Sequence, residues 1–434
     1  MREAVARHHT SPRATEGFPL VKKPRSARER LRDPQHLLRA WQAISKRRPE
    51  SRGLDQITID EFRNNLHRHI RIISEQLRDG SFSFTPARGV LIPKAGSTKK
   101  RPIKVPAVRD RVVLKAIALL IRPKFEKYDL DCSFGYVRKR GVKDAVDRVN
   151  KLAAQGKKIV LKADIHSFFD EVDQDLLIDQ FVREIRLRSL TALVRDALKV
   201  EVGNLDHFSD EDKKCFPTAE SGIPQGGVLS PMLANFYLHR FDEAMMRAGY
   251  NLVRYADDFV VMCASPEEAA SAYALSKRIL EGQLHLHLHD LGAPGSKTRV
   301  IEFYKGLKFL GIHFAGGQTV PCGSVIAKFK DRLHTVLDVR QGNSLLDTLT
   351  TLRNTIVGWG QCYRDLDVYT LYLGLDEYIR TEVSLYLQEH RLLQQGHSVS
   401  LKQLHFLGVP QLRGFKKSQA SEPSPSRDAK GTAA

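Results

Sequence analysis

The sequence has 434 residues, 42% of them hydrophobic, which is enough for several subdomains with a sizeable buried core. Lys and Arg outnumber Asp and Glu by 69 to 50, and the resulting net charge of +19 indicates an extended polyanion as partner. No run of 18 apolar residues occurs, and the first twenty residues lack an apolar stretch, so we expect neither a membrane span nor a secretory signal. The five cysteines contain no Cys-x-x-Cys pair, which favours free thiols in a reducing cytoplasm.

The N-terminal region is strongly basic, with 13 Lys and Arg against 5 Asp and Glu in residues 1–50. Residues 1–30 are rich in Arg, Pro and Ser, and we expect a disordered arm there. Residues 31–79 carry apolar side chains at helical spacing, which predicts a helical region. Within it, Trp41 could stack on a base, but a position in the core is the simpler interpretation.

A buried strand and a hairpin are predicted further along the chain. The apolar run from Ile159 to Ala163 is typical of a buried strand, and Asp164 stands at its end. Two more apolar runs, 251–254 and 259–262, flank a polar turn that contains Asp257 and Asp258. The chain therefore offers one carboxylate at a strand end and two at a hairpin turn.

Adjacent carboxylates at a turn repel each other unless a cation lies between them, and Mg²⁺ prefers such hard oxygen ligands. With Asp164 as a third carboxylate, the set could hold two ions, which can stabilise the attacking and leaving oxygens of a phosphoryl displacement. Taken alone, Asp257 and Asp258 would also fit an ordinary solvated turn.

Between these carboxylates lies the glycine-containing loop of residues 222–231. Pro224 fixes one backbone dihedral, and the glycines at 226 and 227 let the main chain approach a ligand closely. Ser230 is the expected N-cap of the helix that follows, with Pro231 at its first position. A glycine loop at a helix N-terminus is a ready site for a triphosphate or a template backbone.

The strand that ends at Asp164, the 222–231 loop and the hairpin with Asp257 and Asp258 follow one another in the chain. In this order they resemble segments of the reverse transcriptases, and specifically of the bacterial enzymes of the group II intron type. Further matching segments are 91–94, 100–103, 105–111, 133–138, 295–298, 309–312 and 356–364. The resemblance covers residues 30 to 385. It implies an α+β right-hand polymerase fold, with fingers and palm over 80–318, a helical thumb over 319–395 and a partly disordered tail over 396–434.

The resemblance also implies roles for single residues at the catalytic centre. Asp164, Asp257 and Asp258 match the metal ligands, with the Ile165 carbonyl as a further ligand. Two Mg²⁺ ions are the implied cofactor, and Mn²⁺ is an alternative. Lys297 matches a residue that could either protonate the pyrophosphate leaving group or simply contact a phosphate.

The residues implied to bind the nucleotide are Lys94, Arg101, Phe169, Gln225 and Gly226. Phe169 matches the steric gate whose ring clashes with a 2′-OH and so selects dNTPs, although a core aromatic, the role assigned to Phe168, stays open. Arg101 and Lys94 match triphosphate contacts, and the planar fork of Arg suits phosphate oxygens best.

The residues implied to contact primer and template are Tyr255, Trp359, Tyr363 and Arg364. Each has an alternative, because Tyr255 could pack within the hairpin and the other three could belong to the thumb core.

The implied activity is the addition of dNTPs to a DNA or RNA primer on an RNA template. No Cys follows Cys362, so a zinc-associated nuclease is not expected, and a free-standing enzyme of antiviral defence with a dedicated noncoding RNA is the first hypothesis. An intron maturase without a nuclease domain is the second and a retron-like system the third. A non-catalytic RNA-binding splicing cofactor is the rival from another class. A partner protein or a homo-oligomer stays open.

Overall fold

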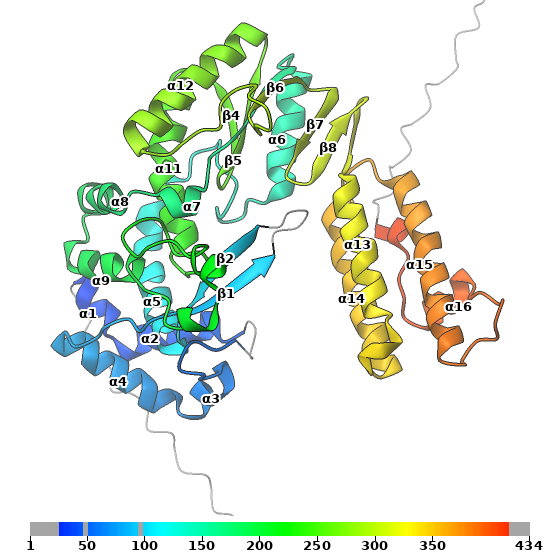
Figure 1. Ribbon diagram of the computed structural model, residues 1–434, viewed down its shortest axis with the longest axis horizontal. Coiled ribbons are helices and arrows are strands. Elements are labelled where there is room, and N and C mark those ends of the chain that lie inside the picture. The colour runs from blue at the N-terminus through cyan, green and yellow to red at the C-terminus, as the bar shows by residue number, and fades with distance from the viewer. Residues whose placement is uncertain (1–25, 47–50, 94–98, 416–434) are drawn as a thin grey trace, which may run out of the picture. The chain divides into compact units, whose positions relative to one another are not determined.

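The computed structural model describes residues 26–46, 51–93 and 99–415, and the chain divides into two compact units, Met1–Val300 and Ile301–Ala434 (Figure 1). Each unit has an apolar core of its own. Helices and strands are both present in each unit, in agreement with the predicted α+β class. None of the helices in the described ranges has the length and apolar content needed to cross a bilayer.

The first unit opens with four helices: α1 (Ala27–Leu31), α2 (Pro34–Ile44), α3 (Ile59–Asn64) and α4 (Leu66–Asp79). The expectation of a disordered arm over residues 1–30 is wrong for residues 26–30. There the Ser26 hydroxyl accepts a hydrogen bond from the Glu29 backbone, the Glu29 carboxylate accepts one from the Ser26 backbone, and Leu31 is buried. Residues 1–25 lie outside the described residues. Trp41 is buried and stacks on Phe62, as the core interpretation predicts.

The main sheet of the first unit has the strand order β4-β5-β3-β6. The strands are β3 (Ile159–Asp164), β4 (Asn251–Tyr255), β5 (Asp258–Cys263) and β6 (Arg299–Glu302). Strand β5 is antiparallel to both β3 and β4, and residues 259–263 of β5 are all buried. Helix α12 (Pro266–Leu284) packs on β3 and β5, and helix α6 (Val142–Ala154) packs on β4 and β5. This burial explains the uninterrupted apolar run of the central strand.

The segment predicted as fingers and palm, 80–318, begins with the hairpin of β1 (Arg88–Pro93) and β2 (Lys100–Val105), followed by α5 (Val108–Phe125). Figure 1 shows this hairpin below the main sheet in the first unit. The other helices of this unit are α7 (Phe168–Glu171), α8 (Gln174–Gln180), α9 (Arg188–Leu198), α10 (Asp210–Lys213) and α11 (Ser230–Arg247). Helix α11 contacts β4 and therefore lies next to the hairpin that carries Asp257.

The second unit begins with an antiparallel sheet of β7 (Lys305–Phe309), β8 (Ile312–Ala315) and β9 (Gln318–Pro321). Its helices are α13 (Gly323–Val336), α14 (Leu345–Tyr363), α15 (Tyr369–Glu389) and α16 (Leu401–Phe406). Helices α13 and α14 run side by side (Figure 1).

The boundary between the two units falls at residue 300, whereas the sequence placed the start of the thumb at residue 319. Two hydrogen bonds attach the small sheet to the second unit. The Asp367 backbone N–H donates to the Thr319 carbonyl at 3.0 Å, and the Thr319 backbone N–H donates to the Asp367 carboxylate at 2.8 Å. The segment from residue 396 is also folded as far as residue 415. Leu412 is buried there, and its backbone N–H donates to the Asp376 carboxylate at 2.6 Å. Residues 416–434 lie outside the described residues.

Candidate active site

Two of the three predicted metal ligands face each other across the main sheet, and the third, Asp257, lies in the adjoining turn. Asp164 ends β3 and stands directly opposite Asp258, which begins β5. On its other side, Asp258 stands opposite Tyr255 at the end of β4, so the hairpin turn consists of Ala256 and Asp257 alone. The prediction of a turn containing both aspartates is therefore corrected by one residue, since Asp258 belongs to the strand.

Asp258 is a buried carboxylate beside other negative charges. Burial raises its pKa to about 6, Asp164 and Asp257 add to the rise, and Lys162 opposes it. Its Oδ1 atom is buried and accepts no hydrogen bond from any described residue. A buried oxygen without a donor beside like charges is a favourable position for a cation ligand.

Asp164 is already engaged by a cationic side chain. The Lys297 ammonium donates to Oδ2 of Asp164 at 2.7 Å, and Nε2 of His289 lies 3.6 Å from the same oxygen. Ile165 follows directly and is held by an antiparallel bridge to Leu288. The structure thus brings Lys297 to the predicted centre, and its role as proton donor or phosphate contact stays a prediction.

The donor set suits Mg²⁺, because carboxylate oxygens are its preferred protein ligands. Across the described residues, no three His, Cys, Asp or Glu side chains are already arranged around a common point. Mg²⁺ is usually held by one or two carboxylates together with water and substrate phosphates, so a complete protein cage is not needed. The residues present fit the ion.

The loop of residues 222–227 is fixed to the segment that carries Phe169. The Ile223 backbone N–H donates to the Phe169 carbonyl at 2.6 Å, and the Gln225 side chain donates to Asp170 at 3.2 Å. From the other side, the backbone N–H of Lys104 in β2 donates to the Gln225 carbonyl at 2.9 Å. The loop therefore joins the hairpin of β1 and β2 to the segment after β3.

Ser230 does not cap helix α11 as predicted. It is the first residue of the helix, and its hydroxyl donates to the Pro224 carbonyl at 2.5 Å. This hydrogen bond closes the loop on itself. Helix α11 begins at Ser230, one residue earlier than predicted, and the Ser230 hydroxyl bonds to the loop instead of capping the helix.

The predicted nucleotide contacts fall in different environments. Phe168 is buried, as expected, while the half-buried ring of Phe169 lies 5.2 Å from that of Phe168 in a T-shaped arrangement. Arg101 is exposed on β2, opposite Ile92. Lys94 lies outside the described residues.

The predicted primer and template residues divide between the two units. Tyr255 is partly buried at the end of β4, beside the aspartates. Trp359 stacks on Phe329 at 4.5 Å, and the Tyr363 ring lies 4.8 Å from Trp359, so both pack against the core of the second unit. Arg364 is exposed, with its guanidinium 3.8 Å from Asp365.

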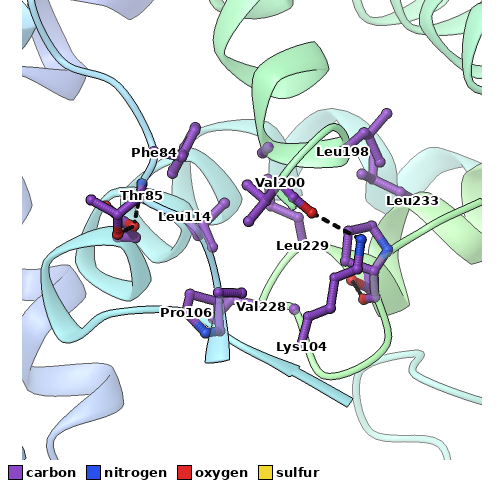
Figure 2. A pocket seen from close by; sticks show the side chains of 16 residues that line it. Phe84, Thr85, Lys104, Pro106, Leu114, Leu198, Val200, Val228, Leu229 and Leu233 are labelled. Carbon is purple, nitrogen blue, oxygen red and sulfur yellow. Dashed lines mark hydrogen bonds between the residues drawn. The ribbon is translucent and has the colours of Figure 1, made fainter. Parts of the chain in front are cut away.

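A cavity of about 30 Å³ lies behind the 224–230 loop (Figure 2). Its polar side chains are already paired: the Lys104 ammonium donates to the Val200 carbonyl at 2.8 Å, and the Thr85 hydroxyl donates to Asp110 at 2.6 Å. The remaining wall is largely apolar. Space for about two water molecules cannot hold a nucleotide, so the cavity is a packing gap behind the site.

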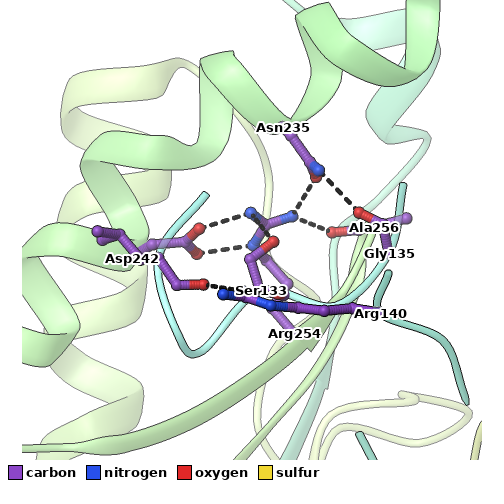
Figure 3. Close-up of polar contacts among 8 residues, drawn as sticks. Ser133, Gly135, Arg140, Asn235, Asp242, Arg254 and Ala256 are labelled. Carbon is purple, nitrogen blue, oxygen red and sulfur yellow. Dashed lines mark hydrogen bonds and ion pairs between the residues drawn. The ribbon is translucent and has the colours of Figure 1, made fainter. Parts of the chain in front are cut away.

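Arg254 is a buried residue beside the candidate site that the sequence reasoning did not single out. Its guanidinium is buried beside the hairpin turn and bonds to Asp242, Asn235 and the Ala256 carbonyl (Figure 3). The available signal was a charged residue between Val253 and Tyr255, inside a segment predicted as a strand. A charge at such a position needs a buried partner, and the partner lies on α11.

Comparisons with known proteins identify the family of the chain. The family described as "Reverse transcriptase (RNA-dependent DNA polymerase)" matches residues 92–314. Protein YkfC of Escherichia coli (strain K12) is 28% identical over 306 residues, covering 62% of this chain and 77% of YkfC. The group II intron-encoded protein LtrA of Lactococcus lactis subsp. cremoris is 29% identical over 203 residues, covering 47% of this chain and only 32% of LtrA. Among solved structures, a partial Cas6-RT-Cas1–Cas2 complex has a TM-score of 0.36 at 22% identity, covering 62% of this chain and 45% of that chain.

The family match spans about half of the chain and includes the three aspartates, the 222–227 loop and Lys297. The chain therefore belongs to the reverse transcriptase family, the RNA-dependent DNA polymerases.

Proposed function

We propose that this protein extends a DNA or RNA primer with dNTPs on an RNA template by two-metal phosphoryl transfer. The observation that carries the proposal is the cross-strand pairing of Asp164 with Asp258, next to Asp257 in the turn. These three carboxylates would hold the ions, with the Ile165 carbonyl as a further ligand. When bound, Mg²⁺ or Mn²⁺ would stabilise the attacking and leaving oxygens of the displacement.

The surrounding side chains support substrate binding in the same place. Lys297 contacts Asp164 and would move onto the triphosphate or the leaving pyrophosphate once that carboxylate binds a cation. Arg101 would contact the triphosphate from the fingers hairpin. Gln225 and Gly226 would support the nucleotide, because their loop is joined to both the hairpin and the Phe169 segment.

Primer extension tests the proposal directly. Asp257→Asn with Asp258→Asn keeps the shape of both side chains and removes their charges, so extension should fall by roughly 100-fold or more. The exposed adjacent pair Asp210→Asn with Glu211→Gln is the matched control and should keep full activity. Full extension by the first variant would show that the centre lies elsewhere.

For the biological role, antiviral defence with a dedicated noncoding RNA in the cytoplasm remains the first hypothesis. The name of LtrA, a group II intron-encoded protein, favours an intron role as the second candidate. Phage plating on cells that carry the wild type or the Asp257→Asn, Asp258→Asn variant tests defence. An in vitro splicing assay with the RNA that co-purifies tests the intron role, since splicing alone would not need the carboxylates.

A further inference from the structure

The guanidinium of Arg254 lies at the centre of a buried polar cluster (Figure 3). The side chain of Arg254 is 1% exposed and that of its partner Asp242 is 0% exposed. Nε donates to one oxygen of Asp242 at 2.6 Å, and Nη2 donates to the other at 2.5 Å. This two-point contact fixes the plane of the guanidinium.

The rest of the guanidinium reaches toward the metal-binding turn. Nη2 donates to the Ser133 hydroxyl at 2.9 Å, and Nη1 donates to the Asn235 side chain at 3.0 Å. Nη1 also donates to the Ala256 carbonyl at 2.8 Å. An arginine side chain has five N–H groups, and these hydrogen bonds use all of them.

The Ala256 carbonyl belongs to a turn whose backbone conformation depends on its surroundings. Ala256 is the first of the two turn residues and has φ +60°, a conformation for which such turns usually employ glycine. A non-glycine residue keeps this conformation only where its surroundings hold it. The backbone of Gly135 also packs closely against the turn, since a Cβ at Gly135 would lie 2.4 Å from the Ala256 nitrogen.

Stability alone gives a weak reason for such an arrangement. A buried ion pair is often replaceable by apolar side chains of similar volume without loss of stability. An apolar pair, however, could not donate to the Ala256 carbonyl. A lysine could not serve either, because its point charge cannot reach Asp242 and Ala256 in one fixed geometry.

We propose that Arg254 is a positioning residue that holds the Ala256–Asp257 turn and thereby sets the cation affinity of Asp257 and Asp258. This inference rests on the proposed metal-binding role of those two aspartates. Arg254 touches neither substrate nor cation and acts through the Ala256 carbonyl. Outer partners of metal ligands typically change affinity by about 10- to 100-fold when they are removed.

Two variants of the full-length protein test the inference. Arg254→Lys keeps the charge facing Asp242 and gives up the donor to Ala256. Arg254→Met with Asp242→Leu removes both charges together, so no buried charge is left alone. Mn²⁺ binding, followed by the decrease of the free-ion electron paramagnetic resonance signal, should weaken by about 10- to 100-fold in both variants. The Mg²⁺ concentration for half-maximal extension should rise by a similar factor, while melting temperature stays near that of the wild type.

The matched control lies on the same helix as Asp242. Arg247 and Glu243 form an exposed ion pair on α11, and Arg247→Met with Glu243→Leu should leave Mn²⁺ binding unchanged. A folded Arg254 variant that binds Mn²⁺ as tightly as the wild type would overturn the inference. The Asp257→Asn, Asp258→Asn variant distinguishes failure of this inference from failure of the proposed function. If that variant binds Mn²⁺ normally, the proposed metal site itself is wrong. Should the double replacement at 254 and 242 unfold, Arg254→Lys alone decides.

Discussion

Phe169 carries the prediction of sugar selectivity, and its surroundings allow a clear experiment. Its ring is half-buried, whereas the neighbouring Phe168 is fully buried. Phe169→Val removes most of the ring, so discrimination against rNTPs should fall by roughly 10- to 100-fold in the ratio of kcat/KM values. Phe168→Val is the control and should lower melting temperature without changing that ratio. A destabilised Phe169→Val variant with unchanged discrimination would assign Phe169 to the core.

The raised pKa of Asp258 predicts how pH changes the metal-free protein. In the unfolded chain this carboxyl titrates near 3.8, and in the folded protein near 6, so ionisation favours unfolding as pH rises through this window. Asp258→Asn should therefore raise the melting temperature at pH 8 without metal and leave it almost unchanged below pH 4. Mg²⁺ should stabilise the wild type more at pH 8 than at pH 5, because binding needs the ionised carboxylate. Thermal melts across this range, with and without Mg²⁺, check both effects. Equal Mg²⁺ stabilisation at both pH values would argue against Asp258 as a ligand.

At the residue scale, the sequence identified chemical types more readily than partners. Asp164, Asp257 and Asp258 stand out because carboxylates at strand ends and turns are conspicuous. The hydrogen bond between Lys297 and Asp164 spans 133 residues, and only the arrangement of the folded chain brings the two together. Arg254 was missed for the same reason, since its partners on α11 and in segment 133–135 are remote in sequence or belong to another element.

At the element scale, the 222–227 loop offers a test of how the fingers hairpin is attached. Gly226 has φ +94°, and a Cβ there would lie 2.8 Å from the Ile103 side chain and 3.2 Å from the Lys104 carbonyl. Gly226→Ala should strain the loop and push it from β2, raising the dNTP KM by about 10-fold, for a strain of roughly 1–3 kcal/mol. Gly249→Ala is a control for positive φ in open space, since its Cβ would meet nothing within 4 Å. Equal effects of the two variants on the dNTP KM would show that the packing of the loop on β2 does not contribute to dNTP binding.

The strands themselves could be predicted because apolar runs bounded by polar turns have few alternatives. The run 159–163 and both arms of the hairpin are strands in the structure. Their register could not be predicted, although it decides that Asp164 faces Asp258. Pairing between β3 and β5 joins segments separated by five α-helices and strand β4, so no local turn fixes it.

At the scale of the whole molecule, the sequence indicated several subdomains but placed one boundary too late. The small sheet of β7, β8 and β9 resembles a continuation of the main sheet in sequence, since its strands follow directly after β6. Hydrogen bonds between Thr319 and Asp367 instead attach it to the second unit. Apolar periodicity predicts which helices and strands form. The unit that a strand or helix joins depends on interactions between residues that are remote in sequence.

The N-terminal charge predicts a separable contribution to RNA binding. Residues 1–25 contain six Lys and Arg against two Glu, and no predicted metal ligand or nucleotide-binding residue lies there. Deleting them should weaken binding to structured RNA and flatten its salt dependence, by roughly 0.7 to 0.9 in slope for each phosphate that is no longer neutralised. Extension of a pre-annealed primer at low salt should persist. Binding isotherms at several salt concentrations, together with dNTP titrations, measure both effects.

The end point of that deletion matters, because α1 is part of the folded first unit. A deletion through residue 32 would also remove the Ser26 cap and the buried Leu31, so it should lower the melting temperature as well as the affinity. Arg101→Ala is the opposite test: it should raise the dNTP requirement and leave RNA affinity nearly intact, since binding of the triphosphate is local to the substrate. If the 1–25 deletion and Arg101→Ala gave the same phenotype, RNA binding and nucleotide binding would not be divided between these two basic segments.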